Sequence, residues 1–248
     1  MYVKLFIVLY GLIRLLSPKQ TPEKTMSEIV ELPSYKKDVK NLISELQGVF
    51  PAEKLAVFNN DAAQLGKDHS SPLKIARGDK APNFKLPNAF NKIVDLSALL
   101  LKGPVVLTFY RGVWCPYCNL QLKMFQQILP EIKKRGASLV AISPMNPDNS
   151  IATIEASELE FEVLSDDKNR VARQFTSVFK NADEPIQAMS DLGFDFYSFY
   201  DDNSAELPVS ATFVIDQDAH VLFAKSEGGD YRQRVEPKEI VDILNTLG

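Results

Sequence analysis

The spacing of apolar residues predicts two helices followed by a larger domain of alternating strands and helices. A first helix is expected over 38–50, since apolar side chains recur there at intervals of three and four. A second is expected to begin at Pro51, because proline fits a first helical turn, and to end at Gly66. These helices form a predicted extension, residues 27–71, ahead of a domain at 72–248. The apolar positions of the first helix are Val39, Leu42, Ile43, Leu46 and Val49.

The pattern of the larger domain predicts a mixed sheet. Residues 105–110 form a continuous apolar run, which is typical of a central strand covered on both faces. Strands that alternate with helices and end in a hairpin and a helix indicate an α/β fold with helices on both faces of the sheet. The other predicted strands are 84–86, 92–94, 138–142, 161–164, 211–215 and 219–224, and the predicted helices are 116–135, 148–158, 170–175 and 237–247.

The N-terminal segment, residues 1–26, is set apart by an apolar run at 5–13 between Lys4 and Arg14. The run is shorter than the roughly 20 residues that span a bilayer. It has the length of a signal-peptide core but no small-x-small cleavage site follows it. Two interpretations stay open: a targeting or anchoring segment, which touches a membrane only if 5–16 are retained, and a dispensable extension before Met26. A cytoplasmic location is expected.

Composition narrows the function classes. The chain has 248 residues, of which 45% are hydrophobic and 24% charged, with a formal net charge of −4. No basic block is interleaved with aromatic residues, so a nucleic-acid partner is not expected. Its two cysteines are too few for a secreted disulfide framework. A structural zinc site is not expected either, since it needs about four ligands and the two histidines, His69 and His220, lie far apart in sequence.

The two cysteines, Cys115 and Cys118, lie three positions apart between the apolar strand and the helix predicted at 116–135. Pro116 suits the first turn of that helix. A helix N-terminus presents unpaired N–H groups and a partial positive charge, which stabilise a thiolate. The pair can therefore close a small disulfide at a helix start, and a catalytic role is favoured over a structural one. The chain is predicted to be a redox protein.

The segment at 108–120, TFYRGVWCPYCNL, resembles the signature of peroxiredoxin-like proteins of the alkyl hydroperoxide reductase/thiol-specific antioxidant (AhpC/TSA) family. Similar segments occur in family order at 78–84, 141–144, 211–216 and 230–232. The similarity spans residues 72–248. It implies a thioredoxin fold, peroxide or dithiol chemistry, no metal or bound cofactor, and an external dithiol reductant such as thioredoxin, glutaredoxin or glutathione.

The resemblance is incomplete at the usual activating groups. The peroxiredoxin motif Pro-x-x-x-Thr/Ser-x-x-Cys places Cys118 at the peroxidatic position and Cys115 where Thr or Ser stands. The family's later arginine falls near Ser210, and thioredoxins carry a cis-proline near the same place. A cis bond before serine would cost about 3 kcal/mol. An altered loop, or Pro208 in the proline's role, is therefore expected.

The resemblance and the helix position favour different nucleophiles. The resemblance favours Cys118 for attack on a peroxide. The helix N-terminus favours Cys115, whose expected exposure would also admit a bulky disulfide substrate. Both assignments stay open at this stage.

Arg111 is the candidate helper, placed to lower a thiol pKa or hold an oxyanion, with a solvated loop charge as the alternative. Trp114 is expected to fence the site or pack under it. The segment at 230–234, which contains Arg234, is expected to be a structural loop. The residues predicted to lie near the substrate are Trp114, Pro116, Tyr117 and Ser210.

These features predict a thiol-dependent peroxidase that reduces hydrogen peroxide or organic hydroperoxides. A thiolate of the pair attacks the peroxide, the sulfenic acid condenses with its neighbour, and the external dithiol reduces the disulfide. A protein disulfide reductase is one alternative, since Cys-Pro-Tyr-Cys resembles the glutaredoxin tetrapeptide and the usual arginine is missing. A non-catalytic redox-sensing interaction module is another. Formation of a homodimer is left open by the sequence.

Overall fold

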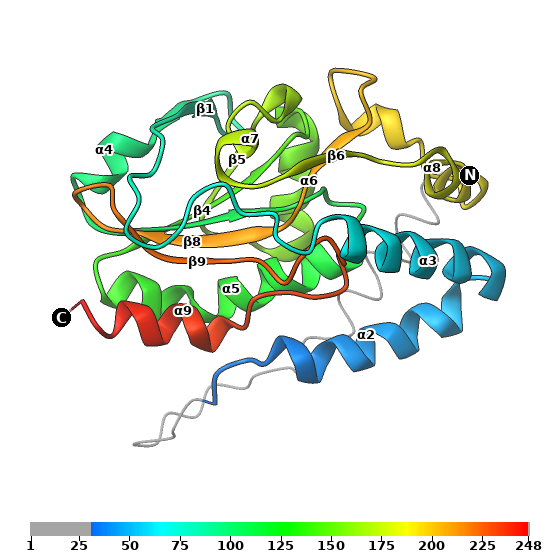
Figure 1. Cartoon of the computed structure of the whole chain (residues 1–248), viewed down its shortest axis with the longest axis horizontal. Helices are drawn as coiled ribbons and strands as arrows, with labels where there is room; N and C mark the ends of the chain where they lie inside the picture. Colours follow the sequence, from blue (N-terminus) through cyan, green and yellow to red (C-terminus); the bar gives the residue numbers. More distant parts are fainter. Residues whose placement is uncertain (1–30, 248) are drawn as a thin grey trace.

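The computed structural model describes residues 31–247 (Figure 1), so the predicted segment 1–26 lies outside the described residues. Its centre is a five-stranded sheet in the order β5-β4-β3-β8-β9. β3 pairs parallel with β4 and antiparallel with β8, so the sheet is mixed as predicted. The strands are β3 (Val105–Phe109), β4 (Ser138–Ser143), β5 (Glu162–Ser165), β8 (Ala211–Ile215) and β9 (Val221–Lys225).

The central strand β3 is buried along its whole length, as its unbroken apolar run predicts. Successive side chains of a strand point to opposite faces. Val105, Leu107 and Phe109 pack into the core on one face, whereas Val106 packs with Phe125 on the other. A strand with two apolar faces therefore needs a layer on each side.

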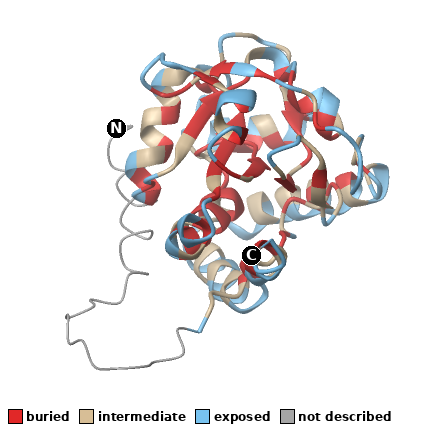
Figure 2. Ribbon diagram, turned by 90° about the vertical axis from the view of Figure 1, so that its left-hand side faces the viewer, coloured by how far each residue is buried: buried red, intermediate tan, exposed pale blue. Residues whose placement is uncertain are grey.

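The two layers differ in composition. The helices α5 (Pro116–Lys134), α6 (Pro147–Ser157) and α9 (Pro237–Leu244) cover one face. Shorter elements cover the other, and the buried residues gather between the layers (Figure 2). These are β1 (Lys85–Pro87), β2 (Ile93–Asp95), α4 (Leu96–Leu100) and α7 (Ala172–Phe175). This arrangement is a thioredoxin fold, as the resemblance implies.

The N-terminal helices are α2 (Tyr35–Val49), which packs on α5, and α3 (Ala52–Asp68), which packs on α8 (Asp183–Asp191). Both predicted helices are present. Gly66 does not end the second one, because α3 continues to Asp68. The carboxylate of Glu236 accepts hydrogen bonds from the backbone N–H groups of Tyr35 and Lys36 at 2.9 and 2.8 Å. One side chain thus ties the start of α2 to the segment before α9.

The region between α7 and β8 holds elements that the apolar pattern does not predict. β6 (Val178–Lys180) pairs antiparallel with β7 (Glu206–Pro208), and α8 lies between them in sequence. The 3-10 helix η2 (Phe196–Phe199) also lies in this region, and a second 3-10 helix, η1 (Asp167–Asn169), precedes α7. These elements are three to nine residues long, which is too short for a clear period.

In the loop before β8, Pro208 was one of two expected replacements for the cis-proline of thioredoxins, and the structure does not support it. Every peptide bond in residues 31–247 is trans, and Pro208 lies in β7 opposite Val178. Pro208 therefore does not take the role of a cis-proline. The loop is instead joined to its neighbour through the backbone carbonyl of Ser210, which accepts a hydrogen bond from the Ser226 hydroxyl at 2.7 Å. Within residues 31–247, none of the helices combines the length and apolar character needed to cross a membrane.

Candidate active site

The two cysteines occupy the start of α5. Cys115 is the N-cap residue, with extended backbone angles, and Cys118 lies in the first turn. The backbone N–H of Cys118 donates to the Cys115 carbonyl at 3.1 Å, and the Asn119 side chain donates to the Val113 carbonyl at 2.6 Å. Both cysteines are thiols, with exposed fractions of 1% and 0%. The predicted exposure of Cys115 is therefore wrong.

Cys118 is the thiol with charged partners. Arg234 donates a hydrogen bond from Nη2 to Cys118 Sγ at 3.2 Å, and both groups are buried. Burial by itself raises the pKa of Cys118. The hydrogen bond from the Cys115 thiol, the guanidinium charges of Arg234 and Arg111 and the Arg111 backbone N–H together outweigh burial, so the pKa of Cys118 lies well below the usual thiol value. Cys118 is therefore the more acidic thiol of the pair.

Cys115 is the less acidic thiol of the pair. Burial, the hydrogen bond that it donates to Cys118 and the negative charge there raise its pKa well above the usual value. The prediction that the helix N-terminus activates Cys115 is therefore wrong. The exclusion of water from Cys115 and the negative charge on Cys118 raise this pKa. Together they outweigh the partial positive charge of the helix N-terminus, which stabilises a thiolate by up to about 2 kcal/mol.

Arg111 lies in the site as predicted, and it is not the solvated loop charge of the alternative interpretation. Its exposed fraction is 4%. Its guanidinium carbon lies 3.8 Å from the centre of the Tyr231 ring and 4.7 Å from that of Trp114. A cation between two aromatic faces keeps its charge in a place with little water. That charge contributes to the lowered pKa of Cys118.

Arg234 is a residue of the candidate site that the sequence-based interpretation missed. It was expected in a structural loop, but its exposed fraction is 4% and its guanidinium reaches the thiolate. Nη1 donates to the carbonyls of Tyr231 and Gln233, which fixes the side chain. One feature of the sequence could have indicated Arg234. No arginine lies near Ser210, so a cation beside the thiols has to come from another part of the chain.

The substrate-proximal residues divide into two groups. Trp114, Pro116 and Tyr117 border a cavity at the thiol pair, and Trp114 Nε1 donates to the Tyr200 hydroxyl at 2.8 Å. Trp114 thus forms part of the wall of this cavity, as expected. Ser210 does not line this cavity: it lies in the loop before β8, and its buried hydroxyl has no hydrogen-bond partner.

The cavity beside Cys115, called here the thiol cavity, has a volume of about 90 Å³. The helices α2, α3 and α8 close it from outside, and Arg111 and Asn181 supply polar groups. Cys118 does not line it, so the cavity meets Cys115 first. The aliphatic and aromatic residues that line it are Leu46, Phe50, Leu55, Phe58, Trp114, Pro116, Tyr117, Pro185, Met189, Leu192, Phe194 and Tyr231, and Asn59 lines it as well.

The helices α2 and α3 lie over the two thiols and are called here the cover. A glycine in the loop before α9 allows the end of α3 to approach that loop closely. Gly229 donates its backbone N–H to the His69 carbonyl at 2.9 Å. A Cβ at position 229 would lie 2.1 Å from the Leu65 carbonyl oxygen. Only glycine permits this approach, so the loop before α9 and the end of α3 touch through their backbones.

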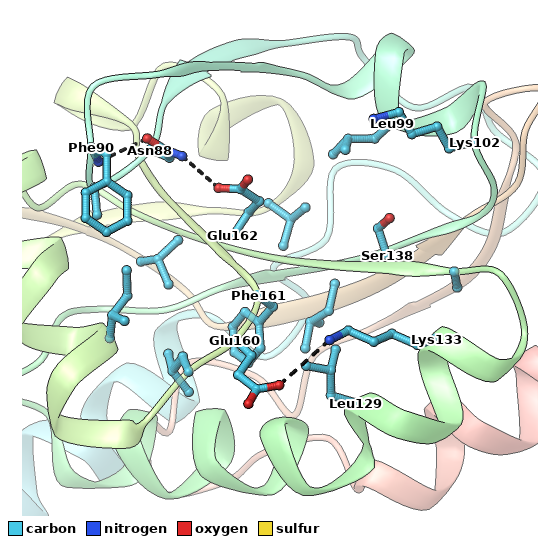
Figure 3. Close-up of a pocket in the computed structure, with 17 residues that line it drawn as sticks. Asn88, Phe90, Leu99, Lys102, Leu129, Lys133, Ser138, Glu160, Phe161 and Glu162 are labelled. Atoms are coloured by element: carbon cyan, nitrogen blue, oxygen red, sulfur yellow. Dashed lines mark hydrogen bonds and ion pairs between the residues drawn. The ribbon is translucent and has the colours of Figure 1, made fainter.

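A larger open groove of about 560 Å³ lies at the other end of α5, beside β5 (Figure 3). Lys133 and Glu160 form an ion pair across it at 3.8 Å, and the Asn88 amide donates to Glu162 at 2.9 Å. It contains no thiol, so its size does not make it the candidate active site. Within residues 31–247 no three side chains of His, Cys, Asp or Glu are grouped to hold a metal ion.

The buried cysteine pair, at the start of the helix that follows the central strand, defines a dithiol protein with a thioredoxin fold. Residues 77–224 match the model of the AhpC/TSA family. This match covers more than half of the chain, and the chain belongs to the AhpC/TSA family.

Curated relatives are similar over part of their length. The chain is 35% identical over 98 residues to "Putative peroxiredoxin bcp" of Buchnera aphidicola subsp. Schizaphis graminum, a match that covers 40% of this chain and 61% of that protein. It is 34% identical over 102 residues to "Peroxiredoxin Q, chloroplastic" of Triticum aestivum, with 41% and 46% covered. The chain thus spans about half of the length of these relatives.

Solved structures agree with the fold. The crystal structure of peroxidoxin BcpB from Mycobacterium tuberculosis superposes with a TM-score of 0.55 at 26% identity, covering 70% of this chain and 99% of that one. A reduced 2-Cys peroxiredoxin from Plasmodium vivax gives a TM-score of 0.51 at 17% identity, covering 70% and 96%.

Proposed function

We propose that this protein is a thiol-dependent peroxidase in which Cys118 attacks the hydroperoxide and Cys115 resolves the product. The observation that carries the proposal is the 3.2 Å contact between Arg234 Nη2 and Cys118 Sγ in a buried site. A thiolate is the nucleophile in thiol chemistry, and a buried guanidinium stabilises it. The names of the curated relatives support the same chemistry.

The reaction balances with the groups of the site. The Cys118 thiolate attacks the distal oxygen of R–O–O–H, the O–O bond breaks, and Cys118 becomes a sulfenic acid while the alkoxide takes a proton to leave as an alcohol. The Cys115 thiol then displaces hydroxide from the sulfenic acid, which yields the Cys115–Cys118 disulfide and water. Sulfur is oxidised by two electrons and the O–O bond is reduced by the same two.

An external dithiol completes the cycle. Its first thiolate attacks one sulfur of the disulfide and its second sulfur resolves the mixed disulfide, which restores both cysteines. Thioredoxin or glutaredoxin supplies both thiols in one molecule, whereas glutathione, which has a single thiol, requires two molecules for the same two steps. Homodimer formation and a cytoplasmic location remain predictions from the sequence.

Arg111 takes the helper role that the sequence suggested for it. Its backbone N–H and guanidinium both face Cys118, so it holds the thiolate before the reaction and the developing oxyanion during it. Its Nε is buried without a hydrogen-bond partner, as is Nε of Arg234. These two N–H groups are available to a peroxide oxygen.

The disulfide reductase alternative is weakened by burial. A protein disulfide must bring its sulfur to an attacking thiolate, and Cys118 has an exposed fraction of 0% beneath α2 and α3. A small peroxide needs far less space. Burial therefore favours a small peroxide as the oxidant in the first step, and the Cys115–Cys118 disulfide must become accessible before the external dithiol can reduce it.

The test is stopped-flow oxidation of the reduced protein by peroxide, combined with trapping of the sulfenic acid by dimedone in Cys115→Ser and Cys118→Ser variants. Cys115→Ser is expected to react rapidly and accumulate a dimedone adduct on Cys118, whereas Cys118→Ser is expected to form none. Slow oxidation of the wild-type thiols by every peroxide tried would remove the peroxidase, and an adduct on Cys115 alone would reverse the two roles.

A further inference from the structure

Two parts of the chain that lie outside the family match meet at the thiol site. The match covers residues 77–224, so it includes both cysteines but neither the cover nor the segment 230–236 before α9, called here the arginine segment. Side chains of the arginine segment donate hydrogen bonds to α3: the Tyr231 hydroxyl to the Phe58 carbonyl at 2.6 Å, and Arg232 Nη1 to the Asn59 amide oxygen at 3.0 Å. The cover is therefore attached to the segment that carries Arg234.

Tyr231 is the residue of the arginine segment whose ring faces the second guanidinium of the site. The centre of its ring lies 3.8 Å from the guanidinium carbon of Arg111, and the centre of the Trp114 ring lies 4.7 Å from the same atom. A cation is attracted to the face of an aromatic ring, most strongly where water is excluded. Arg111 is buried, and its Nε has no hydrogen-bond partner. The two ring contacts therefore restrain where this charge lies.

Each of the two rings is fixed at its polar end. Trp114 Nε1 donates to the Tyr200 hydroxyl at 2.8 Å, whereas the Tyr231 hydroxyl donates to the carbonyl of Phe58 in α3. Burial raises the pKa of Tyr231, so its hydroxyl stays protonated and remains a donor. Trp114 and Tyr200 lie within residues 77–224, and Tyr231 and Phe58 lie outside them. One ring is thus held by the part that matches the family, and the other is held by the N-terminal extension.

We infer that Tyr231 is a positioning residue for the thiolate: its ring holds the Arg111 guanidinium beside the thiol pair, and its hydroxyl fixes that ring to α3. Tyr231 acts through Arg111. The extension then takes part in activating Cys118 besides covering it. The inference rests on the proposed peroxidase function and adds a positioning residue to it.

The expected consequence of losing the ring follows from the lining of the thiol cavity. The charge of Arg111 contributes to the lowered pKa of Cys118. Tyr231 and Arg111 line the cavity and Cys118 does not, so water that replaces the ring screens Arg111 and leaves Cys118 as buried as before. The pKa of Cys118 is then expected to rise. The other ionisable groups near Arg111 and Cys118, which the variants below all keep, are Tyr35, Asp61, Tyr110, Cys115, Tyr200 and Arg234.

The experiment records thiolate absorbance against pH, where the lower of the two thiol titrations reports Cys118, and single-turnover oxidation by hydrogen peroxide. Both are measured in the full chain. Tyr231→Leu removes the ring and the hydroxyl. It is expected to raise the pKa of Cys118 and to lower the rate constant of oxidation roughly tenfold, which is the scale of one cation–π contact in a site with little water.

The conservative variant separates the ring from its attachment. Tyr231→Phe keeps the aromatic face over Arg111 and removes only the hydrogen bond to the Phe58 carbonyl. It is expected to restore most of what Tyr231→Leu loses. The pKa of Cys118 should rise less, and the rate constant should fall roughly threefold, as expected for one hydrogen bond.

The matched control removes a ring elsewhere in the core. Phe175→Leu changes a fully buried aromatic residue of α7, which packs on Phe109 and Phe213 at the other face of the sheet. It is expected to destabilise the fold by an amount similar to that of Tyr231→Leu. The pKa of Cys118 should stay the same, and the rate constant should stay within about twofold.

The outcomes distinguish this inference from the proposed function, because the titration needs no peroxide. An unchanged pKa of Cys118 in Tyr231→Leu would overturn the positioning role, and so would an equal rise in Phe175→Leu, which would reflect lost packing alone. Wild-type behaviour of Tyr231→Phe would overturn the part given to α3. A wild-type protein that no peroxide oxidises, with the pKa still raised in Tyr231→Leu, would remove the peroxidase and keep the positioning role.

Discussion

The two sides of the thiol pair differ in what they offer a substrate. On one side, Cys118 meets the guanidinium groups of Arg234 and Arg111 and carries the lowered pKa. On the other, Cys115 meets the apolar thiol cavity beneath α2 and α3 and carries the raised pKa. Charge activates one sulfur, and shape and burial control access to the other. Two thiols three residues apart at the start of one helix therefore acquire different properties from their surroundings.

The comparison is tested most strongly by exchanging each sulfur for oxygen. Cys118→Ser is expected to lower peroxidase activity by at least about a thousandfold, because it removes the nucleophile. Cys115→Ser is expected to keep the first oxidation step, since its hydroxyl still donates to the Cys118 thiolate. Single-turnover oxidation measured for both variants checks this. Loss of the first step in Cys115→Ser alone would show that the charged side is not the reacting one.

Removal of the Arg234 charge is the next largest change. Arg234→Met keeps the length of the side chain but leaves the thiolate without its hydrogen-bond donor, so the pKa of Cys118 is expected to rise and the oxidation rate at neutral pH to fall on the order of 100-fold. Arg234→Lys keeps a cation and is expected to lose less. The thiolate absorbance recorded against pH reports the pKa directly. An unchanged pKa of Cys118 in Arg234→Met would show that Arg234 does not lower it.

The same residues give a pH dependence of stability. The pKa of Cys118 is lower in the folded chain than the usual value. Its contribution to stability is therefore fully present above the unfolded pKa and is lost as the pH falls through the folded pKa. Urea unfolding of the reduced wild type against Cys118→Ser is expected to show a difference that shrinks toward acid. A difference that grows toward acid would give the opposite sign of the shift.

A change at Gly229 tests whether the packing of α3 controls access to Cys115. Gly229→Ala places a Cβ against the Leu65 carbonyl and is expected to destabilise the protein by about 1–3 kcal/mol. It should also speed alkylation of Cys115, because α3 must move away. Gly48→Ala is the matched control: nothing lies within 4 Å of its added Cβ in α2, so it is expected to be stabilising by about 0.5–1 kcal/mol. Equal effects of both changes would mean that the close approach has no role.

The smallest expected effect concerns the anchor of α2. Glu236→Gln removes the charge that holds the N–H groups of Tyr35 and Lys36, with an expected cost of about 1 kcal/mol. Hydrogen exchange should increase in the first turn of α2 and remain unchanged in β3. Asp242→Asn, which only breaks an exposed pair with Lys238 on α9, is the control and is expected to cost about 0.3–0.5 kcal/mol. Uniformly faster exchange in both variants would indicate a general loss of stability.

Much of the fold could be predicted from the sequence, because its signals are local. The apolar run that became β3, the helical period of α5 and the turn between β8 and β9 each depend on residues close in the chain. The position of the cysteines between β3 and α5 is local as well. The short elements β6, β7 and α8 were missed, since their boundaries depend on pairing partners up to thirty residues away.

The candidate site could be predicted only in part. The sequence determined by itself that Cys115 and Cys118 would share a helix start with Arg111 close by. Only the tertiary structure decided which sulfur is the thiolate, because Arg234 lies 116 positions away from Cys118 in sequence. It also decided that Cys115 is covered and that Asn181 faces the cavity. A pKa depends on distance in space and on exclusion of water, and neither can be read from neighbours along a chain.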